Sequence, residues 1–248
     1  MKLFEAFIYS FFILSLVHCS HTNDVNELQK IKKGERILEM KAFDKALQYF
    51  VSIDASSFSD DSKAVLFRNI SKSYSQLGQI DSAKIYCEKA VNIADKNSFI
   101  YFITKAEFEL FNHQASNAIE TLVNAEKKHP ESEEVAKLFS LIYSGEYGEG
   151  YFDLQKAEKY AVHAFRLKNN NSNKEQLGSI YFDAEKYNLA TKIFKEMYFQ
   201  EPNNNFYQFY YGQALFFDGK ESKGFQLMKG VADKNDSCKI MFDEIFSN

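Results

Sequence analysis

The chain lacks tryptophan and has little proline, glycine or cysteine, since its 248 residues include 2 Pro, 10 Gly and 3 Cys. So few glycines and prolines leave long stretches that nothing interrupts, which favours helices. Three widely spaced cysteines exclude a disulfide-rich scaffold and a CxxC-type metal site. With 30 basic and 34 acidic residues, the formal net charge is -4. The chain therefore has no broad basic field for phosphate backbones, and we do not expect nucleic-acid binding.

Apolar and aromatic side chains are abundant, at 45% of the residues with 25 Phe and 15 Tyr, and they recur in a pattern. The segment 171–204 shows this pattern most clearly. It predicts one helix with a face formed by Leu177, Gly178 and Tyr181, and a second helix with apolar residues three or four apart, namely Tyr187, Ala190, Phe194 and Met197. Both prolines of the chain, Pro130 and Pro202, lie twelve residues after an alanine of this pattern, where they can end the second helix.

This pattern resembles the tetratricopeptide repeat (TPR), a unit of about 34 residues that forms two antiparallel helices. One departure is Lys174, which stands where the family has an aromatic residue. The resemblance implies an all-α fold, an antiparallel helix-pair solenoid of about six repeats with a C-terminal capping helix. The expected repeats are 27–60, 64–97, 99–132, 134–168, 171–204 and 205–238, and the cap is 238–246. We treat 27–248 as one array, because repeats stack without needing a second core.

The fourth repeat departs from the others because its second helix begins late. The intervening segment resembles the Sel1-like relative of the family, in which a glycine-containing loop and an aspartate, here Asp153, precede a Lys-Ala pair, here Lys156-Ala157. The run GEYGEG, residues 145–150, has the wrong glycine order for a phosphate-binding loop and follows a helix instead of a strand. We therefore interpret it as a stretched turn.

The first 26 residues resemble an export signal followed by a short tether. A basic start at Lys2 precedes an apolar run, 7–17, that is too short to span a bilayer. The sequence Leu16-Val17-His18-Cys19 resembles a bacterial lipobox, which implies a signal peptide over 1–18, lipid attachment at Cys19 and a tether over 19–26. Because the family has a small residue in place of His18, ordinary cleavage near Ser20 and an uncleaved anchor remain alternatives. Ser20 slightly favours the outer membrane over the inner one.

No motif for catalysis, metal binding or a cofactor is present. The chain lacks GxSxG, HExxH and Walker-type runs, and its five histidines never fall as i, i+4 pairs. Carboxylates are mixed with lysines in the manner of solvated helix faces. Cys87 lies on the apolar face of its helix, where we expect a small core residue. We therefore expect no enzymatic activity, no cofactor, no metal and no small-molecule substrate.

The resemblance implies that a protein or peptide partner binds a concave groove lined by the first helix of each repeat. Counting from the pattern of 171–204 predicts nine groove residues: Ile31, Leu38, Arg68, Lys72, Ile103, Leu110, Phe206, Phe209 and Phe216. The three phenylalanines give the sixth repeat more apolar surface than a repeat must bury. They could form a hydrophobic groove for a partner, or they could be core residues under the last helices. Arg68 and Lys72 resemble part of the family's carboxylate clamp, but glutamates occupy the neighbouring positions, so we expect a surface ion pair.

Two functional hypotheses follow from this layout. The first is a lipid-anchored scaffold of the bacterial cell envelope that acts in assembly or secretion. Its layout resembles the lipoproteins that help insert outer-membrane barrels and those that pilot pilus secretins, although no motif of either group is matched. The second is a soluble periplasmic or secreted adaptor of the Sel1/TPR type, without a lipid.

Overall fold

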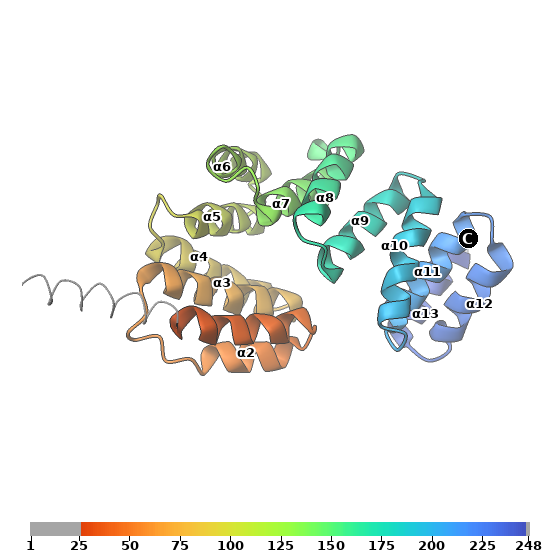
Figure 1. The fold of residues 1–248 in the computed structure, drawn as a ribbon, viewed down its shortest axis with the longest axis horizontal. Coiled ribbons are helices and arrows are strands. Elements are labelled where there is room, and N and C mark those ends of the chain that lie inside the picture. The colour runs from red at the N-terminus through yellow and green to blue at the C-terminus, as the bar shows by residue number, and fades with distance from the viewer. Residues whose placement is uncertain (1–25, 247–248) are drawn as a thin grey trace, which may run out of the picture. The chain divides into compact units, whose positions relative to one another are not determined.

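A computed structural model describes residues 26–246, and this part of the chain contains helices and no strand. The described residues form two compact units, divided between Ala125 and Glu126. Figure 1 shows the helices of each unit. In both units, helices that follow one another in sequence pack as pairs. The predicted all-α fold of consecutive helix pairs is confirmed. The proposed signal peptide and Cys19 lie outside the described residues.

The first unit begins with a helix over residues 26–39. Five further helices follow it, and these are α2 (Phe43–Val51), α3 (Asp60–Gln76), α4 (Ile80–Ile93), α5 (Phe99–Phe111) and α6 (Ala115–Lys128), whose last residues pass the unit boundary. Serine residues cap the N-termini of α3 and α5. The Ser59 side chain accepts a hydrogen bond from the Ser62 backbone N–H, and the Ser98 side chain accepts one from the Tyr101 backbone N–H. Helix α3 packs against α2, α4 and α5.

The second unit contains α7 (Glu133–Tyr143), a short 3₁₀ turn η1 (Glu149–Tyr151), α8 (Leu154–Leu167), α9 (Asn171–Asp183), α10 (Tyr187–Gln200), α11 (Asn205–Phe217), α12 (Glu221–Ala232) and α13 (Asp236–Phe246). Each α-helix from α7 to α12 packs against the next one, and α13 packs on α12 and α11. No helix within residues 26–246 has the length and apolar character needed to cross a membrane.

Close approach within a helix pair depends on a small residue in the first helix. A Cβ atom at Gly34 would lie 2.3 Å from the Phe50 ring, and one at Gly178 would lie 2.7 Å from the Phe194 ring. Glycine is therefore required opposite these rings. Two other pairs have serine at the matching position: the Ser71 hydroxyl donates to the Ala83 carbonyl oxygen at 2.7 Å, and Ser140 donates to that of Ala157 at 2.9 Å. Those hydroxyls tie the two helices together directly.

The stretched turn between α7 and α8 has the expected glycine-rich conformation. Gly145 and Gly148 have φ values of 92° and 120°, which residues with a side chain rarely adopt. The turn closes where the Asp153 N–H donates to the Tyr143 carbonyl oxygen at 2.9 Å, and the Asp153 side chain then caps α8 by accepting from the Lys156 N–H at 3.0 Å. This capping bond holds the pKa of the Asp153 carboxyl below its usual range.

Helix α13 covers apolar surface at the C-terminal end of the second unit. Its Cys238 is buried in one cluster with Phe209 and Met228. Phe246 packs edge-on against Phe216 at 5.2 Å between ring centroids and against Phe225 at the same separation. The predicted capping helix is thus present, and it removes part of the phenylalanine-rich surface of α11 from solvent.

Candidate partner-binding face

The nine predicted groove residues do not share one environment. Ile31, Ile103, Leu110 and Phe209 have exposed fractions of 1%, 0%, 3% and 0%. Neighbouring helices cover these four side chains, so they are core residues and cannot directly line an accessible groove. The position of a residue within the repeat predicts which way its side chain points. It does not predict which neighbouring side chains cover it.

Three other predicted residues keep some exposure. Phe206 is 38% exposed at the start of α11. Leu38 is half-buried against the cluster that contains Ile31 and Phe50. Phe216 is half-buried against Phe246. Of the three predicted phenylalanines, Phe209 is therefore core, Phe216 contacts Phe246 of α13, and Phe206 presents the most surface.

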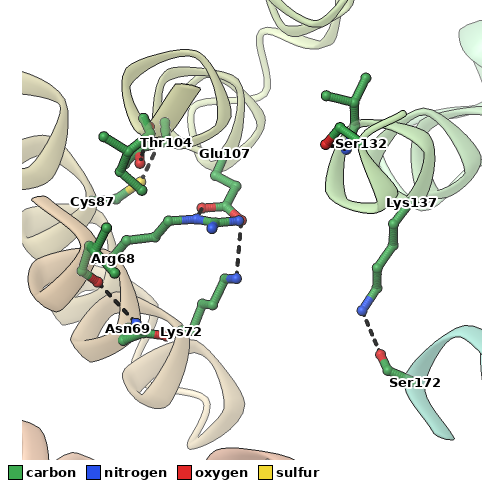
Figure 2. A network of polar contacts seen from close by, with 12 residues as sticks. Arg68, Asn69, Lys72, Cys87, Thr104, Glu107, Ser132, Lys137 and Ser172 are labelled. Carbon is green, nitrogen blue, oxygen red and sulfur yellow. Dashed lines mark hydrogen bonds and ion pairs between the residues drawn. The ribbon is translucent and has the colours of Figure 1, made fainter. Parts of the chain in front are cut away.

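Arg68 and Glu107 form a bidentate ion pair between α3 and α5 (Figure 2). The Arg68 Nε donates to one carboxylate oxygen and Nη2 to the other, each at 2.7 Å. Their side chains are only 9% and 15% exposed. The predicted ion pair exists, but it is largely buried and not on the surface. Because Glu107 occupies both ends of the guanidinium fork, Arg68 is not free to hold a partner's carboxylate.

Polar contacts extend from this pair along the first helices of the unit. Lys72 lies beside this pair (Figure 2). Its Nζ is 3.9 Å from a Glu107 carboxylate oxygen, and 38% of its side chain is exposed. Asn69 donates to the Glu35 carboxylate at 3.0 Å, which links α3 to the helix over 26–39. Three successive first helices are therefore joined by charged or amide groups, and Lys72 is the more solvent-accessible of the two cations at Glu107.

The second unit has a comparable contact that the sequence reasoning missed. Lys137 on α7 donates to the Ser172 hydroxyl on α9 at 2.5 Å (Figure 2). Gln176 donates to the Lys137 carbonyl oxygen at 3.3 Å. A signal was available, because Lys137 precedes the tight-packing Ser140 by three residues, as Arg68 precedes Ser71. Extending the count to the fourth repeat would have found it.

Lys174, the departure from the repeat pattern, is 4% exposed in α9. Its ammonium group donates to Glu196 at 2.6 Å and to Gln200 at 3.3 Å, both on α10. An aromatic residue at this position would join the two helices by apolar contact. Here a charge-assisted hydrogen bond has that role, which is why a lysine is tolerated in a buried position.

Cys87 is not placed to act as a nucleophile. Cys87 is fully buried, as predicted for a core residue, and its Sγ contacts the Thr104 carbonyl oxygen at 3.4 Å. Burial raises the pKa of the Cys87 thiol well above its ordinary value, so it remains protonated and unreactive. Residues 26–246 contain no group of three or more His, Cys, Asp or Glu side chains placed to hold a metal ion.

Helix pairs that pack one after another define a class of protein, the helix-pair repeat protein. Solved structures specify the fold further. The chain is similar to a TPR protein from Thermus thermophilus, TTC0263 (TM-score 0.57, 16% identity, covering 77% of this chain and 99% of that one). It is also similar to a structure of Pseudomonas aeruginosa pilF (TM-score 0.54, 17% identity, covering 76% and 86%).

A third similar structure, the Cut9-Hcn1 hetero-tetramer of the APC/C, has a TM-score of 0.64 at 11% identity. The match covers 89% of this chain but 43% of that one. No family model matches the chain, and no curated protein matches it either. At such identities the likeness concerns the fold alone. The chain has the helix-pair fold of tetratricopeptide-repeat proteins.

Proposed function

We propose that the protein is an exported, lipid-anchored scaffold that binds a protein partner through the first helices of its repeats and acts in bacterial envelope assembly or secretion. The observation that carries the proposal is the partly exposed polar face of those helices, where Lys72 keeps 38% of its side chain exposed beside Glu107. The export and anchoring steps rest on the sequence of the first 26 residues.

Lipid attachment is tested by mass spectrometry of the mature protein isolated from a bacterial host. A diacylated or triacylated N-terminal Cys19 is expected, and Cys19→Ala should shift the protein from the membrane fraction to the soluble fraction. The alternative is a soluble periplasmic or secreted adaptor, which the unusual His18 favours. A free N-terminus at Ser20 or beyond would support that alternative and exclude the anchor.

Partner binding is tested by site-specific photo-crosslinking in cells. A benzoylphenylalanine placed at Phe206 or Lys72 should form adducts with one discrete protein, because both positions are accessible on first helices. The matched control is Ile85, which is 53% exposed on the second helix α4. Adducts of equal yield at all three positions would contradict the assignment of the binding face. Substitutions at Ile103 or Phe209 are unsuitable, because a charge there would disrupt the core.

A further inference from the structure

The helix over residues 26–39 sorts its charged side chains between its two sides. Glu27 is 5% exposed and accepts a hydrogen bond from the Ser59 N–H at 3.2 Å. Glu35 is half-buried and accepts its hydrogen bond from α3. Two of the three glutamates of this helix therefore face the rest of the first unit, and the third, Glu39, is exposed near the end of the helix.

The outward side of the same helix is basic in the middle and apolar at both ends. The three cations on this side are exposed: Lys32, Lys33 and Arg36. The Lys33 Nζ lies 5.3 Å from the centroid of the Tyr49 ring. Leu28 is 40% exposed, and Met40, directly after the helix, is 78% exposed. Positions 28, 32, 36 and 40 recur every four residues, so they form a basic stripe about 18 Å long on one side of the helix.

We infer that this basic stripe rests on a membrane surface that contains anionic phospholipids. The inference relies on the proposed lipid attachment at Cys19. Seven residue steps join Cys19 to Asn26, and they can cover at most roughly 25 Å. An acyl chain on Cys19 would thus keep the start of the helix near the headgroups. Contact between the stripe and the bilayer then becomes an intramolecular event with a high effective concentration.

The shape and charge of the stripe fit a plane of anionic headgroups. A convex helix surface encloses no small ligand, whereas a plane of phosphates can contact all three cations and both apolar side chains together. Each cation near such a surface strengthens the contact about fivefold, so the three together contribute about 100-fold. Because the formal net charge of the chain is -4, the protein as a whole is repelled by an anionic surface, and contact depends on this local stripe. An acidic protein could meet the same cations, but the tether favours the bilayer.

The test uses the chain that begins at Cys19, which keeps every described residue, coupled through this thiol to a maleimide lipid in vesicles. Cys87 and Cys238 are buried, so they do not compete for the maleimide. A dansyl-bearing amino acid incorporated at Met40 reports contact with the bilayer by a blue shift of its emission. The matched probe position is Ile85 on α4, which is 53% exposed.

The test variant removes the three cations of the stripe and is Lys32→Gln/Lys33→Gln/Arg36→Gln. The control variant removes three exposed lysines of the second unit and is Lys192→Gln/Lys195→Gln/Lys223→Gln. Both variants change the net charge of the chain by the same amount, so a difference between them reports the position of the charges. Circular dichroism verifies that both keep the wild-type helicity.

On vesicles that contain phosphatidylglycerol, the probe at Met40 should shift to the blue and the probe at Ile85 should not. The test variant should weaken the contact about 100-fold and lose the shift, while the control variant keeps it. Salt at about 1 M should also remove the shift, because the Debye length falls to about 3 Å.

The inference is overturned if the wild type shows no shift at Met40, or if the shift is equal at the two probe positions. It is also overturned by an equal shift on vesicles of phosphatidylcholine alone, or by an unchanged shift in the test variant. The maleimide lipid supplies the anchor in every case. These outcomes are therefore independent of natural acylation at Cys19, which mass spectrometry tests separately.

Discussion

Replacing Arg68 with methionine is expected to lower the free energy of unfolding by about 3 kcal/mol, because it leaves the Glu107 carboxylate largely buried without its bidentate partner. Lys72 remains 3.9 Å from Glu107 as an ion pair, but its side chain is partly exposed, so it compensates only in part. Urea unfolding followed by far-UV circular dichroism measures the change. The loss should be similar for Glu107→Leu, which removes the carboxylate that Arg68 contacts through Nε and Nη2.

The double variant Arg68→Met/Glu107→Leu distinguishes a charge effect from a packing effect. Apolar replacement of both partners removes the unpaired charge, so the double variant should recover most of the stability lost by either single variant. Lys63→Ala is the exposed control, since it breaks an ion pair with an aspartate whose side chain is 71% exposed, and it should cost less than about 1 kcal/mol. Additive losses in the double variant would show that packing, not charge pairing, explains the effect.

Replacing Gly224 with alanine should destabilise the second unit by about 2–3 kcal/mol, because α11 and α12 meet through their backbones at this residue. A Cβ atom at Gly224 would lie 2.5 Å from the Gly212 carbonyl oxygen and 2.5 Å from the Phe216 amide nitrogen. Backbone atoms cannot swing aside as a flexible side chain does. The two helices would have to separate, which also disturbs the packing of Phe216 against α13.

Gly230 supplies a control within the same helix. No atom lies within 4 Å of a Cβ built there, so Gly230→Ala should stabilise the protein by about 0.5–1 kcal/mol through higher helix propensity. Thermal unfolding of both variants under identical conditions tests the pair of predictions. The prediction would be contradicted if Gly230→Ala lowered the stability or if Gly224→Ala left it unchanged. The second result would mean that α11 and α12 are farther apart at Gly224 than the structure shows.

Much of the fold could be predicted from sequence because its determinants are local. The spacing of Leu177, Gly178 and Phe194 within one repeat specifies which faces of two helices meet, and the structure has the Gly178 backbone against the Phe194 ring. The stretched turn before Asp153 was predictable for the same reason. Such features depend on residues fewer than about 20 positions apart, so a single repeat carries the information.

The candidate site was less predictable, because exposure depends on what neighbouring helices place over a side chain. Arg68 and Ile103 occupy equivalent positions in their repeats, yet one forms an ion pair with Glu107 and the other is fully buried. Phe209 was a groove candidate by counting, and it is buried together with Met228 and Cys238.

The pairing of small and large residues across each repeat has an implication for how such arrays diversify. Gly34 and Gly178 face phenylalanine rings, whereas Ser71 stands beside the smaller Cys87. A serine transplanted opposite Phe50 would drive its Cβ into the ring, and a glycine beside Cys87 would lose the bond to Ala83. Recombination or duplication would therefore tend to preserve whole helix pairs. The unit that can be exchanged between repeats is the pair of helices with its matched small and large residues, and not a single helix.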